Sequence, residues 1–186
     1  MNVLLLCGSL RSGSTNEAVL RTAAEMAPEG VDTDFYDGAA DLPLFNPDDD
    51  AEGAPVNEAV AEMRRHVGAA DAILICTPEY AGALPAALKN VLEWTVGDAG
   101  TYGKPVAWVN AAGPAAPTGA ADAHESLRKV LGYVGAKIVE EACARVPVSR
   151  AVVGEDGTVT DEDARREIQR ALETLVAVTS TAGRVS

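Results

Sequence analysis

The sequence predicts an α/β fold in which a parallel β-sheet is covered by helices on both faces. Short apolar runs, such as AILICT at 72–77, alternate along the chain with longer segments whose apolar residues recur at helical spacing. Most of these runs are apolar at nearly every position, which is typical of strands buried on both faces of a parallel sheet. Their alternation with amphipathic helices predicts helix layers above and below the sheet.

The first half of the chain contains three expected strands, at 2–7, 31–37 and 72–77. Two expected helices lie between them and are marked by apolar residues on one face: Val19, Ala23 and Met26 in the first, and Val56, Val60, Met63 and Val67 in the second. Residues 38–55 are rich in Pro, Asp, Gly and Ala and include the acidic run Asp48–Asp50, so they predict a long loop.

In the second half, PEYAGALP (78–85) interrupts the pattern before a helix expected over Leu84–Thr95. A strand at 105–109 opens into the loop 110–119, and a helix and a fifth strand at 136–140 follow. Apolar residues on one face mark the last two helices: Leu127, Val130, Leu131 and Val134 in the fourth, and Ile168, Ala171, Leu172 and Leu175 in the terminal one.

Five parallel strands suit a flavodoxin-like three-layer sandwich with strand order 2-1-3-4-5. A chain of 186 residues with 47% hydrophobic residues can bury one full core, and no linker interrupts it, so a single domain over 1–186 is expected. In such sheets ligands bind beyond the carboxyl ends of the strands, where the strand order reverses. The loops 8–16, 78–83 and 110–119 all follow strands and are the expected binding loops.

Composition excludes several classes of function. The net charge of −13 disfavours nucleic acid as a partner, because phosphate binding needs clustered Lys and Arg. The sequence contains no apolar run of membrane-spanning length and no recognisable signal peptide, so we expect no membrane partner and a cytoplasmic location. Cys7, Cys76 and Cys143 lack metal-ligand spacing, so no metal site is expected and the thiols are read as reduced.

The first binding loop, GSLRSGSTN at 8–16, restricts the kind of ligand that the site can bind. It is not a nucleoside triphosphate loop, because Ser14 stands where GxxxxGK[ST] needs lysine, and it has neither GxGxxG nor Cys-x5-Arg. What remains is a set of backbone N–H groups, hydroxyls and one guanidinium that can hold a phosphate at a helix N-terminus. The alternative is an ordinary Ser/Thr/Asn helix cap with an unrelated surface arginine.

Three segments together resemble the NADPH-dependent FMN reductase family, whose flavodoxin-like members include quinone, chromate and azo-dye reductases. They are GSLRSGSTN, TPEYAGALPAALKNVLEW and KPVAWVNAAGPAAPTGA. The resemblance implies FMN as cofactor, NADPH or NADH as hydride donor, and a small acceptor such as a quinone, chromate, an azo compound or free flavin. It implies no catalytic side chain, because the flavin carries the chemistry.

The resemblance also assigns residues to three parts of the FMN molecule. The phosphate would be held by Ser9, Arg11, Ser14, Thr15 and Asn16. The isoalloxazine ring would be bordered, largely through backbone groups, by Pro78, Glu79, Tyr80, Ala81 and Gly82. The edge of the ring would be completed by Asn110, Ala112 and Gly113.

The chain departs from the family at Ala81, where asparagine is usual, and at 111–117, where a glycine-rich run is usual. We therefore expect looser FMN binding, with Gly82 absorbing the backbone strain. The resemblance further implies a homodimer or homotetramer through the helix Leu84–Thr95. In such a dimer the loop at Asp48–Asp50 either covers the neighbouring active site or stays disordered and solvated.

Two other expectations complete the sequence reading. His66 and His124 lie among polar neighbours on expected helices and are read as surface residues. Two alternatives to a reductase stay open: a flavodoxin-type electron carrier, which the absence of TxTGxT argues against, and a protein that has lost flavin binding.

Overall fold

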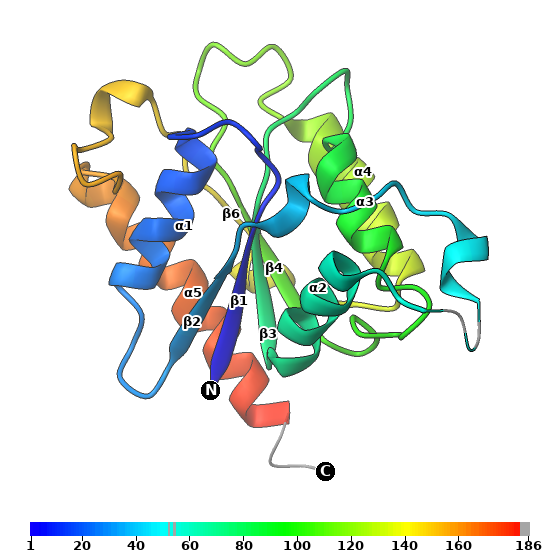
Figure 1. Ribbon diagram of the computed structural model, residues 1–186. Helices are drawn as coiled ribbons and strands as arrows, with labels where there is room; N and C mark the ends of the chain where they lie inside the picture. The colour runs from blue at the N-terminus through cyan, green and yellow to red at the C-terminus, as the bar shows by residue number, and fades with distance from the viewer. Residues whose placement is uncertain (52, 54, 183–186) are drawn as a thin grey trace.

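The computed structural model describes residues 1–51, 53 and 55–182. Its sheet contains β1 (Asn2–Cys7), β2 (Asp32–Tyr36), β3 (Ala72–Cys76), β4 (Pro105–Asn110) and β5 (Lys137–Ile138). The strands are parallel and their order is β2-β1-β3-β4-β5, which confirms the predicted topology (Figure 1).

The fifth strand differs from the expected continuous strand at 136–140. β5 has only two residues, and after a 3₁₀ turn at Glu140–Ala142 the chain returns to the same edge of β4 as β6 (Ala144–Arg145). The charged pair Glu140 and Glu141 cannot be buried against the helix layers. The turn places Glu140 at the surface, where it pairs with Arg128.

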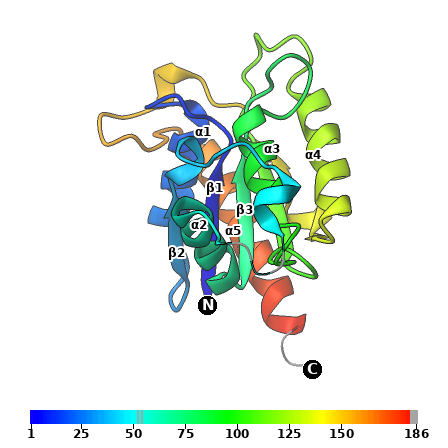
Figure 2. The ribbon, with the colours of Figure 1, turned by 45° about the vertical axis from the view of Figure 1, so that its right-hand side comes forward.

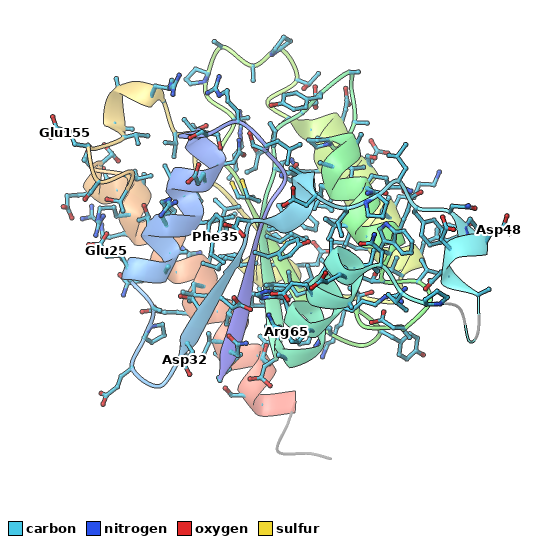
Figure 3. The ribbon with its side chains drawn as sticks, viewed as in Figure 1. Glu25, Asp32, Phe35, Asp48, Arg65 and Glu155 are labelled. Atoms are coloured by element: carbon cyan, nitrogen blue, oxygen red, sulfur yellow. The ribbon has the colours of Figure 1, made fainter. Side chains whose placement is uncertain are left out.

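The helices form the two outer layers (Figure 2). α1 (Thr15–Glu25) and α5 (Glu162–Ala182) pack on one face of the sheet. α2 (Glu58–Ala69), α3 (Ala86–Glu93) and α4 (Ala121–Tyr133) pack on the other. Charged side chains project from the surface, such as Glu25 on α1, Arg65 on α2 and Asp32 at the start of the edge strand β2 (Figure 3).

The strands supply both halves of the core. In β1, Val3 and Leu5 belong to the cluster under α1 and α5, whereas Leu4 and Leu6 belong to the cluster under α2, α3 and α4. All four side chains are buried. Burying one such side chain stabilises the fold by about 1.5–3 kcal/mol, which fixes the strand and the position of the loop that follows it.

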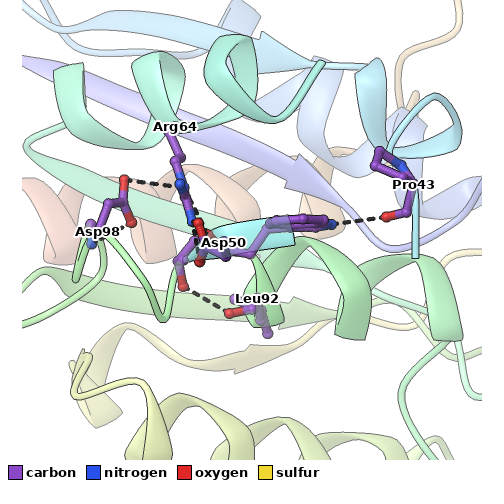
Figure 4. Close-up of polar contacts among 8 residues, drawn as sticks. Pro43, Asp50, Arg64, Leu92 and Asp98 are labelled. Atoms are coloured by element: carbon purple, nitrogen blue, oxygen red, sulfur yellow. Dashed lines mark hydrogen bonds and ion pairs between the residues drawn. The ribbon is translucent and has the colours of Figure 1, made fainter. Parts of the chain in front are cut away.

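The long loop between β2 and α2 is held at several points (Figure 4). The Pro43 carbonyl accepts hydrogen bonds from the side chains of Asn90 and Trp94, each at 2.8 Å. Arg64 binds the carboxylate of Asp50 at 2.7 Å and the carbonyl of Trp94 at 2.8 Å. The expectation of a disordered, solvated acidic run is therefore wrong for Asp50, because the Arg64 guanidinium, itself bound to the Trp94 carbonyl, holds its carboxylate.

No helix in the described part of the chain is long and apolar enough to cross a membrane. The described residues also contain no group of His, Cys, Asp and Glu arranged to hold a metal ion.

Candidate functional site

The loops that follow β1, β3 and β4 meet at the carboxyl end of the sheet, at the top of Figure 1. They enclose a cavity of about 240 Å³. Six residues expected at the site line this cavity: Thr15, Asn16, Pro78, Glu79, Ala112 and Gly113. Ser9 and Arg11 instead line a neighbouring hollow of about 270 Å³ on the β2 side of the first loop, together with Arg21, Phe35 and Asp37. The other expected residues, Ser14, Tyr80, Ala81, Gly82 and Asn110, line neither hollow.

The N-terminus of α1 presents unused hydrogen-bond donors. Ser14 is the N-cap, and its Oγ accepts from the backbone N–H of Glu17 at 3.1 Å. The backbone N–H groups of Thr15 and Asn16 find no acceptor among the described residues, as is usual for the first turn of a helix. These amides, the Ser14 hydroxyl and the helix dipole all favour an anion at this point.

Asn16 is turned into the protein. Its Oδ1 accepts a hydrogen bond from the thiol of Cys76 at 3.3 Å, and its side chain is buried at the floor of the cavity. The N-cap of α1 is Ser14, so Asn16 does not cap the helix. The expected position of Asn16 beside a ligand stays a prediction. Burial raises the pKa of Cys76 well above its ordinary value, and the pKa of Cys7 is raised for the same reason. Both thiols are therefore poor nucleophiles.

The loop after β3 is a tight hairpin. Tyr80 and Ala83 form an antiparallel bridge around Ala81 and Gly82. Both central residues have positive φ, 52° at Ala81 and 71° at Gly82. Gly82 was expected to absorb the strain of this turn, but Ala81 is also left-handed, a conformation that costs a residue with a Cβ roughly 1–2 kcal/mol.

Asn110 organises the loop after β4. Its Oδ1 accepts from the backbone N–H of Ala112 at 2.9 Å, and its Nδ2 donates to the carbonyl of Gly119 at 2.8 Å. Both polar atoms of this buried amide are thus used within the loop. The start of α4 beyond it is strained, because Ala120 has φ 59°.

His124 is buried, which contradicts the expected surface position. Its Nδ1 lies 2.6 Å from the carbonyl of Ala120, its ring lies 5.8 Å from that of Trp108, and its buried Nε2 has no partner among the described residues. Burial lowers the pKa of His124, against smaller opposing effects of Ala120 and of the Glu79 carboxylate. Leu127 and Leu131 occupy the same face of α4, and this spacing was the sequence signal that pointed inward.

Arginines without a carboxylate partner gather around the site. In the described part of the chain most arginines form ion pairs, whereas Arg11, Arg145 and Arg150 form none. Arg150 donates to the carbonyl of Gly13 at 3.2 Å, and the Arg145 guanidinium lies against Gly119. In a chain of net charge −13, these three guanidinium groups lie near the loops and carry no carboxylate partner among the described residues.

Comparison with known proteins agrees with this geometry. Residues 1–148 match the family model described as NADPH-dependent FMN reductase. The chain belongs to the NADPH-dependent FMN reductase family. It is 33% identical over 177 residues to an NAD(P)H-dependent FMN reductase of Pseudomonas aeruginosa, covering 94% of this chain and 93% of the relative. It is 34% identical over 145 residues to a quinone reductase of Escherichia coli K12, covering 76% and 74%.

A solved flavoenzyme structure has a fold similar to that of this FMN reductase family member. The flavoenzyme NAD(P)H:(acceptor) oxidoreductase FerB of Paracoccus denitrificans superposes with a TM-score of 0.82 at 27% identity, covering 97% of each chain. The chemistry of the donors also suits FMN, because one end of the site offers amides, hydroxyls and a guanidinium for a phosphate. The walls of the cavity offer mostly alanine, proline and backbone.

Sequence reasoning missed several residues of this FMN reductase fold. Glu17 binds the N–H of Gly13 at 2.9 Å and pairs with Arg21 at 2.8 Å, so a carboxylate already occupies one amide of the first loop. The pattern Ser14-x-x-Glu17 is a capping-box signal that the sequence did contain. Arg150 and Thr118 carried no such signal, since both reach the site only through the fold.

Proposed function

We propose that the protein is an NAD(P)H-dependent oxidoreductase that holds FMN at the carboxyl end of its sheet and passes hydride from NAD(P)H through the flavin to a small acceptor. The observation that carries the proposal is the unsatisfied donor set at the start of α1. It lies at the point in the strand order where this fold binds ligands. The bound flavin supplies the hydride chemistry, and the chain supplies position and polarity.

The phosphate end of the ligand is assigned to the first loop. Ser9, Ser14 and Thr15 provide hydroxyl donors, Thr15 and Asn16 provide free amides, and Arg11 provides a guanidinium that can donate two hydrogen bonds. The helix fixes the positions of the amides, whereas the exposed side chain of Arg11 is free to turn toward the phosphate. Arg150 adds positive charge beside Gly13.

The ring end is assigned to the other two loops. Pro78 and Glu79 line one side of the cavity and Ala112 and Gly113 the other. Tyr80, Ala81 and Gly82 form the hairpin beyond the first side, and Asn110 braces the loop of the second. Small side chains here leave backbone groups accessible to the polar edge of the ring. Tyr80 on the second loop and Leu10 on the first are each more than half exposed, so an apolar small acceptor finds contacts next to the site.

We also propose that the acceptor is a quinone or another small electrophile of the kinds named above, and that nucleic acid and membranes are not partners. NADPH and NADH both remain candidate donors. A cytoplasmic location fits this function, because cytoplasmic metabolism supplies NAD(P)H and keeps free thiols such as those of this chain reduced.

The quaternary structure we propose is a homodimer or homotetramer of single-domain subunits, each spanning residues 1–186. An apolar hollow of about 370 Å³ lies between α3 and α4, lined by Leu92, Val96, Val130, Tyr133 and Val134. Tyr133 is 89% exposed and Val96 58% exposed, which is unusual for such side chains in a monomer. Light scattering on wild type and Tyr133→Glu tests this: a monomeric wild type would contradict it.

The function is tested by spectroscopy and steady-state kinetics. We expect the purified chain to bind FMN, to bleach its absorption when NADPH is added without oxygen, and to recover it when a quinone is added. Donor and acceptor would use one site in turn, so initial-rate plots should be parallel. Intersecting plots would contradict the shared site, and bound FMN that NADPH does not bleach would favour an electron carrier.

A further inference from the structure

A single carboxylate joins two of the three loops that enclose the cavity. Glu79 follows β3, and its Oε1 accepts a hydrogen bond from the hydroxyl of Thr118 at 2.6 Å. Its Oε2 accepts from the backbone N–H of Ala123 at 3.1 Å. Thr118 and Ala123 both follow β4, so one side chain bridges the ends of two neighbouring strands.

The bond to Ala123 replaces a missing helix cap. The N-cap position of α4 is Ala120, which has no polar side chain and makes no capping hydrogen bond. An N-cap side chain normally accepts from the second or third amide of its helix, and Ala123 carries the third amide of α4. Glu79 provides that acceptor from another loop, together with a negative charge that the helix N-terminus favours.

The loop between these anchors has little else to hold it. Pro114, Ala115, Pro117 and Thr118 are exposed, and its backbone bonds are three turns, in which the amides of Ala116, Gly119 and Ala121 each donate to the carbonyl three residues earlier. Asn110 holds the loop through Ala112 and Gly119, and the amide of Val148 donates to the carbonyl of Ala111. Glu79 is therefore the main connection between this loop and the opposite wall of the cavity.

We propose that Glu79 is a positioning residue that caps α4 across the cavity and thereby sets the separation of the two loops that flank the flavin ring. The identity of the ligand rests on the function proposed above, whereas the cross-loop cap does not. Each oxygen of the Glu79 carboxylate already accepts one hydrogen bond, from Thr118 or from Ala123. Glu79 therefore acts on the flavin through the loops, and only its backbone borders the ring.

Three variants of the full-length chain test this proposal. Glu79→Gln keeps the size of the side chain but removes the charge that both donors share. Thr118→Val removes the hydroxyl that donates to Oε1 of Glu79 and leaves the hydrogen bond from the Ala123 amide to Oε2. Glu141→Gln is the matched control, because Glu141 is exposed on the far side of β5 and makes no side-chain bond among the described residues.

The first measurement is amide hydrogen exchange of residues 112–123 without flavin. We expect faster exchange in Glu79→Gln, centred on Ala123, and no change in Glu141→Gln. Thr118→Val should speed exchange only before α4, since the helix keeps its cap. Unchanged exchange in Glu79→Gln would overturn the proposal, whether or not the protein binds flavin.

The second measurement is flavin affinity, by fluorescence titration with FMN and with riboflavin. Glu79→Gln should weaken both ligands by the same factor, on the order of 10-fold, and Thr118→Val by roughly 2- to 12-fold. The double variant should lose less than the product of the two factors, because both changes break one shared bond. The visible circular dichroism of bound flavin should change in Glu79→Gln, which a purely structural loss of stability would not produce.

Two outcomes would overturn the proposal that Glu79 positions the two loops that flank the flavin ring. In the first, both variants keep wild-type affinity for FMN and riboflavin. In the second, Glu79→Gln slows reduction by NADPH while affinity and exchange stay unchanged, which would mean that the carboxylate acts directly on the reacting atoms. A wild type that binds no flavin would instead contradict the proposed function, and the exchange experiment would still decide whether Glu79 caps α4.

Discussion

Tyr80 and Ala83 exchange two backbone hydrogen bonds, each amide donating to the other residue's carbonyl at 3.1 Å. This pairing closes a two-residue turn in which Ala81 and Gly82 both have positive φ. Asn-Gly is the sequence that such turns favour, because asparagine tolerates the left-handed region better than other residues with a Cβ. The chain has Ala-Gly there.

Ala81→Asn should therefore tighten FMN by roughly 2- to 12-fold, and riboflavin by a similar factor, because the new amide lies near the ring and relieves turn strain. Fluorescence titration of the apoprotein measures both. Ala99→Asn is the control, since Ala99 has φ 53° outside the three binding loops. Unchanged or weaker flavin binding in Ala81→Asn would show that the hairpin does not border the ring.

Arg11→Ala should weaken FMN by about 10- to 150-fold, since one charge-assisted hydrogen bond contributes roughly 1.5–3 kcal/mol. Riboflavin, which lacks the phosphate, should be affected far less. Arg65→Ala removes an exposed arginine that pairs with Glu62 and should leave both affinities unchanged. Equal weakening of FMN and riboflavin by Arg11→Ala would assign Arg11 to the fold.

His124 should make stability depend on pH. Burial lowers its pKa below the ordinary 6.5, so below that value the unfolded chain takes up the proton more readily than the folded one. The contribution of neutral His124 to the free energy of unfolding is complete above this ordinary pKa and is lost as the pH falls. Denaturant unfolding between about pH 5 and 7 should show a smaller loss in His124→Asn, whose amide keeps a donor for Ala120 without titrating. A flatter profile in His66→Asn instead would contradict this assignment.

Cys76→Ser should keep the rate of flavin reduction within roughly 3-fold of wild type, because a fully buried thiol with a raised pKa is not a reactive group. Serine also retains a donor for Asn16, whereas Cys76→Ala leaves that buried oxygen without a partner and should lower stability by about 1–3 kcal/mol. Stopped-flow reduction by NADPH measures the rate. A loss of 10³-fold or more in Cys76→Ser with flavin bound would give the thiol a role in turnover.

The sequence was sufficient for the parallel sheet because β3 throughout and β1 from Val3 onward are apolar, and a parallel sheet with helices on both faces buries such strands. It failed at 136–145, where Glu140 and Glu141 interrupt an edge strand and the alternation of charge and apolar residues does not show on which side the chain re-enters. His124 was misplaced because its neighbours in sequence are polar, although its spacing to Leu127 is that of a buried face.

The candidate site, like the fold, was predicted only in part. Residue types in the first loop indicated an anion, since hydroxyls, an arginine and a helix start are local features. The use of Glu79 was hidden, because its partners lie 39 and 44 residues further along the chain and are chosen by the fold. Asn110 likewise looked available to a ligand, but tertiary structure uses both of its polar atoms.

Arg11, Arg145 and Arg150 give the molecule an uneven electrostatic field. At low ionic strength, where the Debye length is about 30 Å at 0.01 M salt, an approaching anionic dinucleotide meets the repulsion of a chain with net charge −13. Close to the loops it meets three guanidinium groups instead. Moderate salt screens the distant repulsion more than the contact attraction, so the association rate of NAD(P)H should rise with added salt before it falls.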